Sequence, residues 1–281
     1  MRRSSSDARR AWENALPERV MSCEDEWGLM QTGQPFEHGR ASIVLPARKG
    51  RADVVLKLQF PHRESEYEAE ALELWDGDGA IRLVASSVEH SALLIERCVP
   101  GTHLSAEDAK RALNVLIGLL PRLWKPAGEP FHTLADEAAW WCSYLPAGWE
   151  LAGRPCEQRL LDAGVSALRE LAPTQGEQVL LHQDLHADNV LAAEREPWLV
   201  IDPKPLVGER EFAVAPIVRS PELGHSRREV LERFDRLTGE LGLDRERARG
   251  WTVGQTLAWA FDEARYHVRH LEAAQWLLEA E

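Results

Sequence analysis

The sequence predicts an α+β protein with two lobes, a small β-rich N-terminal lobe and a larger, mostly helical C-terminal lobe. Before residue 98, short apolar runs alternate with polar turns, which is typical of strands and hairpins. After residue 105, apolar residues recur at the three- and four-residue intervals of amphipathic helices. The tripeptide VPG at 99–101 interrupts both patterns. We therefore expect lobes at residues 1–98 and 99–281.

The N-terminal lobe is expected to contain four strands and one helix. Apolar runs at 41–47 and 52–59 flank the polar turn RKGR, which predicts a hairpin. Residues 64–75 follow with apolar side chains at helical spacing and end at the turn DGDG. Two shorter apolar runs, at 81–85 and 92–95, predict the remaining strands.

Helices dominate the expected C-terminal lobe. Ser105 and Asp108 resemble a capping box before an apolar stripe. Two short apolar runs, at 179–181 and 198–201, predict strands between the helices. Three further helical patterns lie at 157–171, 230–241 and 251–278, the last with room for one break.

The charge balance excludes some partners. The chain has 33 basic and 46 acidic side chains and a net charge of −13. Nucleic-acid binding requires a basic face, so we expect no nucleic-acid partner. An acidic protein suits a cationic small molecule, although the same charge also serves solubility.

Cysteine usage and hydropathy predict a cytoplasmic protein. The four cysteines form no C-x-x-C pair, so we expect neither a zinc site nor a disulfide framework. Residues 1–20 lack the apolar core of a secretory signal. No run reaches the ~18 apolar residues of a membrane span. The sequence does not indicate an oligomeric state.

The most informative segment is 181–204, LHQDLHADNVLAAEREPWLVIDPK. It places Asp184 after an apolar run, Asn189 five residues later, and Asp202 at the end of a second apolar run. Phosphoryl transfer from ATP needs a base for the attacking hydroxyl and oxygen ligands for Mg²⁺. Asp184 is the candidate base, and Asn189 and Asp202 are candidate magnesium ligands on either side of one small hairpin. Their intervals, five and then thirteen residues, match the protein-kinase pattern.

Two alternative interpretations of this segment stay open. Histidine and aspartate alternate at every second position of residues 182–188, and such a cluster in a metallohydrolase could bind zinc or another transition metal. The second alternative is a non-catalytic nucleotide-binding module, although a degenerate site tends to lose one of its polar residues.

A cation for the ATP phosphates is expected from Lys57. It lies within the apolar strand VVLKLQF, where a lysine needs a partner. The following helix offers Glu68, which precedes Leu72 by one turn on the inward face; Glu64 and Glu70 are alternatives. A solvated edge-strand lysine is the competing interpretation.

The remaining nucleotide contacts rest on weaker patterns. Gly39 and Ser42 lie in a turn before the first hairpin strand, where backbone N–H groups could bind phosphate. Glu96 and Cys98 flank the connection that would recognise adenine through backbone groups.

For the acceptor site the sequence offers aromatic and acidic residues of the C-terminal lobe. Asp262 and Glu263, on a helix that bears tryptophan, could face a guanidinium group. A solvated helix face with core tryptophans explains the same pattern. The candidates are Trp141, Trp259, Asp262 and Glu263.

With these residues in place, the chain resembles the aminoglycoside phosphotransferase family, and within it the aminoglycoside/hydroxyurea resistance kinase branch. The resemblance implies a protein-kinase-like two-lobed fold, ATP and Mg²⁺ as cosubstrates, and O-phosphorylation of a small molecule. It implies that Asp184 is the catalytic Asp, that Asn189 and Asp202 bind magnesium, and that Lys57 binds phosphate. The matching segments are 67–84, 93–104, 181–191, 198–212 and 250–261.

One residue departs from the family pattern. Gln183 stands where the family usually has Gly between the His and the catalytic Asp, and Gly tolerates dihedrals that Gln does not. We expect an ATP- and magnesium-dependent kinase of a hydroxylated, cationic small molecule such as streptomycin. Hydroxyurea or another small metabolite is the alternative acceptor.

Overall fold

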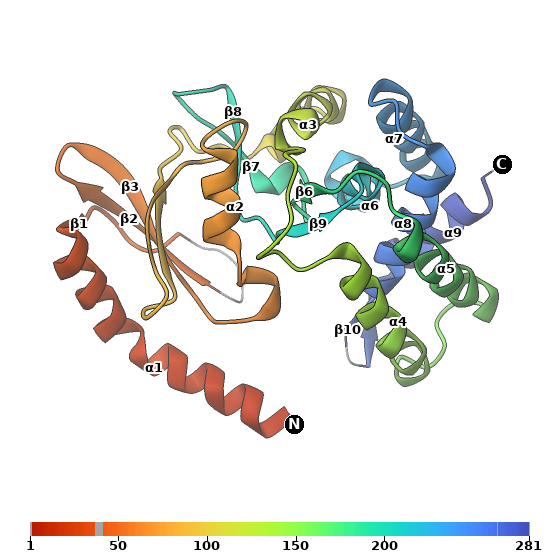
Figure 1. Ribbon diagram of the computed structural model, residues 1–281, viewed down its shortest axis with the longest axis horizontal. Helices are drawn as coiled ribbons and strands as arrows, with labels where there is room; N and C mark the ends of the chain where they lie inside the picture. The colour runs from red at the N-terminus through yellow and green to blue at the C-terminus, as the bar shows by residue number, and fades with distance from the viewer. Residues whose placement is uncertain (1, 37–41, 263, 281) are drawn as a thin grey trace.

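A five-stranded antiparallel sheet forms the N-terminal part of the molecule (Figure 1). The computed structural model describes residues 2–36, 42–262 and 264–280. The strands lie in the order β1-β2-β3-β5-β4, and β2 and β3 form the predicted hairpin. Their bounds are Leu29–Gln31 (β1), Ser42–Lys49 (β2), Ala52–Gln59 (β3), Leu83–Ser87 (β4) and Ala92–Glu96 (β5).

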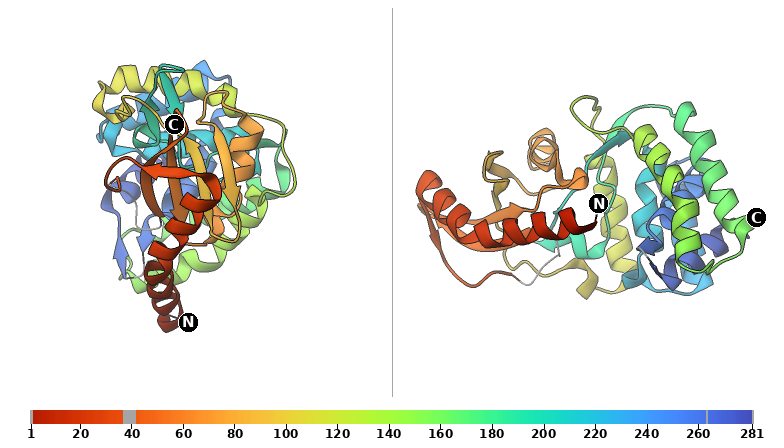
Figure 2. Two further views of the ribbon diagram at one scale, coloured as in Figure 1. Left: turned by 90° about the vertical axis from the view of Figure 1, so that its left-hand side faces the viewer. Right: turned by 90° about the horizontal axis from the view of Figure 1, so that it is seen from below.

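Helices cover both faces of this sheet. On one face, Leu56 and Leu58 of β3 pack with Trp12 of α1 (Arg2–Trp27). On the other, Val55 belongs to the same buried apolar cluster as Trp75 of α2 (Glu68–Trp75). Alternate residues of a strand point to opposite faces, so Lys57 lies on the same face as Val55, toward α2. Figures 1 and 2 show α1 running along the outer side of the sheet.

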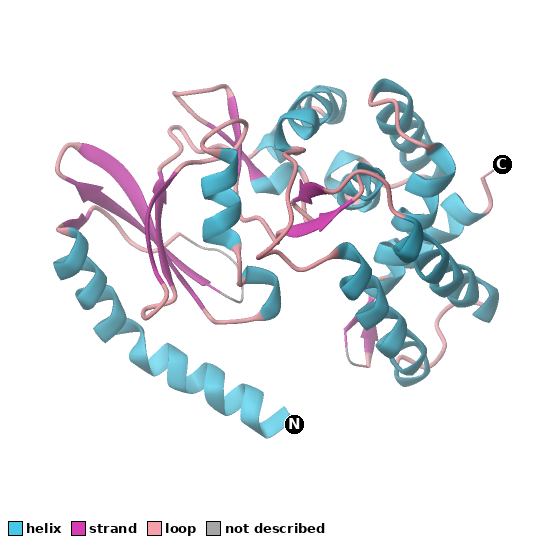
Figure 3. Ribbon diagram, in the orientation of Figure 1, coloured by secondary structure: helices cyan, strands magenta, loops and turns pink. Residues whose placement is uncertain are grey.

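The C-terminal part is mostly helical, as predicted, and Figure 3 shows the change from strands to helices along the long axis. Its core is continuous with the α2 face of the sheet. The helices are α3 (Ala109–Leu123), α4 (Leu134–Leu151), α5 (Gln158–Leu171), α6 (Ala215–Arg219), α7 (Arg227–Glu240), α8 (Arg245–Ala258) and α9 (Val268–Leu278).

Helix α8 packs closely against α5. A Cβ atom added at Gly254 would lie 2.6 Å from Leu168, and one added at Gly164 would lie 2.5 Å from Leu257. Any larger residue at these positions would push the two helices apart. This close packing matters for the site because α8 carries Gln255, which reaches the loop before Asp184.

Three two-stranded ribbons join the helices. Strands β6 and β9 form one, β7 and β8 the second, and β10 and β11 the third. The predicted strands at 179–181 and 198–201 therefore pair with other partners and not with each other. The bounds are Val179–Leu181 (β6), Val190–Ala192 (β7), Trp198–Val200 (β8), Leu206–Gly208 (β9), Phe261–Asp262 (β10) and Arg265–Tyr266 (β11).

Several expected boundaries need correction. Asp108, not Ser105, caps α3: its side chain accepts hydrogen bonds from two backbone amides of the first turn, both at 3.1 Å. Ser105 instead donates to Asp188. The helical pattern at 251–278 is split by the β10–β11 hairpin, so Asp262 lies on a strand and is exposed. The helix expected from residue 64 begins at Glu68.

The hairpin β7–β8 joins the two parts of the molecule. The backbone amide of Ile81 donates to the carbonyl of Val200 at 3.0 Å. Beside it, Arg195 donates to the carbonyl of Ala80 at 2.9 Å and to Glu96 at 2.9 Å. The lobe boundary at residues 98 and 99 stays a prediction. In the described part of the chain, no helix is both long and apolar enough to cross a membrane.

Candidate active site

A cleft of about 570 Å³ lies between the sheet and the helical part. Strands β2, β3 and β5 supply one wall, and the segment from Asp184 to Asp202 supplies the other. The predicted base Asp184 lines it, as do most of the residues predicted for the nucleotide and the metal: Ser42, Lys57, Glu96, Cys98, Asn189 and Asp202. Gly39 lies outside the described residues.

Lys57 is buried among carboxylates at the back of this cleft. Its Nζ lies 2.7 and 2.8 Å from the two carboxylate oxygens of Glu68 and also contacts Asp202. The predicted Lys57–Glu68 contact is therefore present, and the alternatives Glu64 and Glu70 do not make it. Glu68 also accepts from the side-chain amide of Gln59. Lys57, Glu68 and Asp202 together link the sheet, α2 and the end of the β7–β8 hairpin.

These contacts change the pKa values of Lys57 and Asp202. Burial alone would lower the pKa of Lys57, but the carboxylates of Glu68 and Asp202 outweigh it and raise that pKa. The charge of Lys57 lowers the pKa of Asp202 to about 2, although burial opposes this. Lys57 and Asp202 are therefore both charged at neutral pH.

Asn189 and Asp202 lie on either side of the β7–β8 hairpin, as the sequence predicts. The backbone amide of Ile201 donates to the carbonyl of Asn189 at 3.0 Å and closes the hairpin. The Asn189 amide nitrogen donates to the carbonyl of Asp184 at 2.8 Å, which turns its side-chain oxygen to the other side. That oxygen and the Asp202 carboxylate form a donor set that suits a hard divalent cation.

The loop before Asp184 has an unusual backbone. Gln183 has a φ of +63°, in the left-handed region that Gly adopts at lower cost. Its carbonyl accepts a hydrogen bond of 2.9 Å from the side chain of Gln255 on α8. The side chain of Gln183 is buried. The loop therefore keeps the glycine-type conformation, held by packing against α8.

His182 stabilises this loop through hydrogen bonds to the backbone. Its Nε2 bonds the carbonyl of Ile201 at 2.9 Å, and its Nδ1 accepts from the amide of Asp184 at 3.3 Å. Burial lowers the pKa of His182 to about 4, so the ring is neutral at pH 7. Both ring nitrogens are used by the backbone, which leaves none for a metal.

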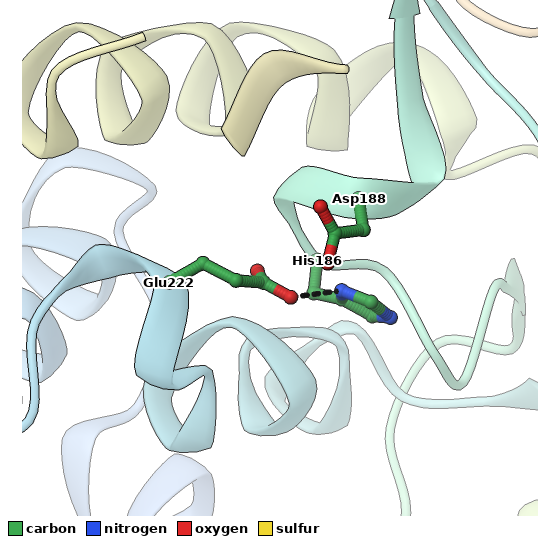
Figure 4. A group of neighbouring side chains, drawn as sticks. All are labelled: His186, Asp188 and Glu222. Atoms are coloured by element: carbon green, nitrogen blue, oxygen red, sulfur yellow. Dashed lines mark hydrogen bonds and ion pairs between the residues drawn. The ribbon is translucent and has the colours of Figure 1, made fainter. Parts of the chain in front are cut away.

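A second polar group is drawn in Figure 4, and two of its residues, His186 and Asp188, line the cleft. The ligand atoms of His186, Asp188 and Glu222 lie within 4.8 Å of one another. His186 Nδ1 is 2.8 Å from Glu222, which also accepts from the amide of Ala187 at 3.2 Å, and Asp188 accepts from Ser105. Because His182 is not part of the group, the alternating His/Asp cluster of a metallohydrolase is not assembled.

Two cations that the sequence interpretation missed hold Asp184. Lys204 Nζ lies 2.9 Å from Asp184 Oδ2, and Arg219 Nη2 lies 3.3 Å from Oδ1. Lys204 follows Asp202 by two residues, but its role could not be inferred from spacing. Arg219 comes 35 residues after Asp184, and nothing in the linear sequence connects the two.

The predicted acceptor residues separate in the structure. Trp259 lies under both cations, with Lys204 4.6 Å and Arg219 4.3 Å from its ring centre. Trp141 is fully buried and stacks on Phe212 at 6.0 Å, which is a core position. Glu263 lies outside the described residues.

Glu96 and Cys98, at the end of β5 and just after it, both line the cleft. The side chain of Glu96 is engaged by Arg195, at 2.9 and 3.0 Å, so it fixes the connection against the β7–β8 hairpin. Burial raises the pKa of Cys98 to about 12, which leaves a neutral thiol. That adenine is recognised here through backbone groups stays a prediction.

The fold and the arrangement of the cleft define a small-molecule phosphotransferase with a protein-kinase-like fold. Structural neighbours share this fold. A choline/ethanolamine kinase family protein from Mesorhizobium loti has a TM-score of 0.64 at 15% identity, covering 93% of this chain and 95% of its own. Spectinomycin phosphotransferase APH(9)-Ia, in complex with ADP and spectinomycin, has a TM-score of 0.59 at 13% identity, with coverage of 94% and 93%.

The chain belongs to the aminoglycoside/hydroxyurea antibiotic resistance kinase family, whose model matches residues 26–266. It is 42% identical over 278 residues to hydroxyurea phosphotransferase from Kitasatospora aureofaciens, covering 95% of this chain and 79% of the relative. It is 41% identical over 263 residues to streptomycin 6-kinase from Streptomyces griseus, covering 91% and 85%. These relatives confirm the predicted family and the class of reaction, phosphoryl transfer to a hydroxyl of a small molecule.

Proposed function

We propose that this protein transfers the γ-phosphoryl group of ATP, with Mg²⁺, to a hydroxyl of an aminocyclitol antibiotic such as streptomycin. One observation carries the proposal: Lys57, Asp184, Asn189 and Asp202 come from separate elements and meet at one cleft. The relatives named for streptomycin support the acceptor class.

Each of these residues has a distinct role in the proposal. Lys57, held by Glu68, binds the phosphates of ATP from the sheet side. Asn189 and Asp202 hold magnesium, which when bound neutralises charge on the phosphates. Asp184 accepts the proton of the acceptor hydroxyl and orients its oxygen toward the phosphorus.

The central test is Asp184→Asn. The change keeps the size of the side chain but removes the base, so turnover should fall about 10²–10⁴-fold. ATP binding should persist, because the phosphate-binding Lys57 is unaffected. Asp53→Asn, at the exposed start of β3, is the matched control and should keep full activity. Near-normal turnover of the Asp184 variant would exclude the assigned base.

Hydroxyurea is the second candidate acceptor, favoured by the relative at 42% identity. An ADP-release screen with streptomycin, other aminoglycosides and hydroxyurea separates the two. Saturable ADP release with streptomycin and none with hydroxyurea supports the first candidate, and the reverse supports the second. ADP release with none of them would overturn the antibiotic assignment.

A further inference from the structure

Two cations bind the two oxygens of Asp184 separately. Lys204 Nζ lies 2.9 Å from Oδ2 and Arg219 Nη2 lies 3.3 Å from Oδ1. We call this pair, Lys204 and Arg219, the cationic clamp. A carboxylate held at both oxygens by charged donors has a fixed plane, because each contact restricts rotation about the Cβ–Cγ bond.

The face of Trp259 supports the clamp. The Lys204 ammonium lies 4.6 Å and the Arg219 guanidinium 4.3 Å from the ring centre. Cation–π attraction of this kind holds cations in place and is strongest when they are shielded from water. Trp259 therefore holds the Lys204 ammonium and the Arg219 guanidinium against its ring face. Through these two cations it also positions Asp184.

The burial of Arg219 is energetically unfavourable. Its side chain is 8% exposed, and its Nε has no hydrogen-bond partner among the described residues. Burying a guanidinium with donors unsatisfied destabilises a fold. The nearby Arg233 is equally buried, yet it donates to the carbonyls of Val218 and Leu223 at 2.6 and 2.8 Å. Arg233 stabilises the fold, whereas Arg219 is directed at Asp184.

The clamp lies outside the lining of the cleft. Asp184 lines the cleft between the lobes, but neither Lys204 nor Arg219 is among the described residues that line it. The two cations therefore contact Asp184 without lining the cleft themselves. Of the two, Lys204 is the more exposed, at 25% of its side chain, and it has a second carboxylate, Glu64, at 3.5 Å.

We propose that Lys204 and Arg219 are positioning residues that fix Asp184 for catalysis, and that Lys204 yields Oδ2 to the acceptor hydroxyl. Arg219 keeps Oδ1 throughout, while Lys204 turns toward Glu64. The hydroxyl proton then passes to Oδ2 and the oxygen lone pair forms the new P–O bond. The bond between the γ-phosphorus and the bridging oxygen breaks, and its electrons leave with ADP. This inference rests on the proposed role of Asp184.

The test separates kcat from KM. Lys204→Met and Arg219→Met should each lower kcat about 10–100-fold, because a misplaced base costs rate without costing binding. The KM for ATP should change less than twofold. Arg219→Lys should recover part of the rate, since it keeps the charge. Lys125→Met, a half-exposed lysine paired with Asp78, is the control and should keep kcat.

A double-mutant cycle shows whether the clamp acts through Asp184. In an Asp184→Asn background, Lys204→Met should cost less than threefold further, because its target has gone. Equal losses in both backgrounds would overturn the inference, as would an unchanged kcat in Lys204→Met. If Arg219→Met fails to fold, Lys204→Met and Arg219→Lys still decide. An inactive wild-type protein across all acceptors would instead refute the proposed function.

Discussion

The substitution Glu68→Gln tests whether Glu68 positions Lys57 in the cleft. The substitution keeps the shape of the side chain and removes one negative charge from a buried group. Glu68 and Lys57 are 2% and 5% exposed, so water cannot replace the lost contact. Lys57 would keep only Asp202 as a charged partner and would be drawn toward it, away from the position that suits the phosphates.

The size of the effect follows from the hydrogen bonds. Lys57 donates to both oxygens of Glu68, at 2.7 and 2.8 Å, and a glutamine offers a single oxygen. Whichever way the new amide is turned, its nitrogen replaces an oxygen that now accepts from Lys57. Losing one charge-assisted bond and leaving one buried donor unsatisfied should cost about 2–4 kcal/mol. That corresponds to a fall in Tm of about 4–16 °C at ~2–4 °C per kcal/mol.

Calorimetry and ATP titration measure both consequences. We expect a lower Tm and a raised Kd for ATP in Glu68→Gln. Glu70→Gln is the control, because residues two apart on a helix point to nearly opposite sides, and it should match the wild type. A Glu68→Gln protein with wild-type Tm and ATP affinity would refute the view that Glu68 positions Lys57.

Three further predictions concern the loops around the cleft. The contribution of His182 to stability should fall by about 3 kcal/mol as pH drops from 6.5 to about 4, because the unfolded chain protonates His182 and the folded chain does not. His182→Gln should remove this component from urea titrations run across that pH range. Gln183→Ala should be about 1 kcal/mol less stable than Gln183→Gly by thermal unfolding, since alanine is strained at a φ of +63°. Arg195→Met should lower Tm and weaken ATP binding, because Arg195 fixes Glu96 beside the cleft at 2.9 Å; wild-type values for both would contradict this.

Two pairs of site residues that the sequence predicted are close in the chain or are fixed by a short element. Asn189 and Asp202 meet because a two-stranded hairpin closes between them. Lys57 and Glu68 meet because the strand is followed directly by the helix that covers it, 11 residues on. In both cases the local spacing determines the contact.

The missed parts depend on packing between distant elements. Arg219 reaches Asp184 only because α6 packs beneath the loop, and its position in the chain carries no pattern. Helix α1 escaped prediction for another reason. Most of its 26 residues are polar, and among residues 7–27, whose burial is described, the buried apolar residues are Trp12, Val20 and Cys23. Tertiary contact with the sheet, rather than its own apolar content, stabilises it.

The net charge of the whole chain does not describe the charge beside Asp184. The protein carries −13 overall, yet the Asp184 carboxylate is contacted by two cations, Lys204 and Arg219. Glu64 is the acidic group that faces Lys204 from η1 (Arg63–Ser65), at 3.5 Å. In the proposed site a cationic acceptor would therefore compete with Lys204 for Glu64, whereas a neutral acceptor would not. The preference for a cationic or a neutral acceptor then depends on whether Lys204 contacts Asp184 or Glu64. The amino-acid composition does not determine this local geometry.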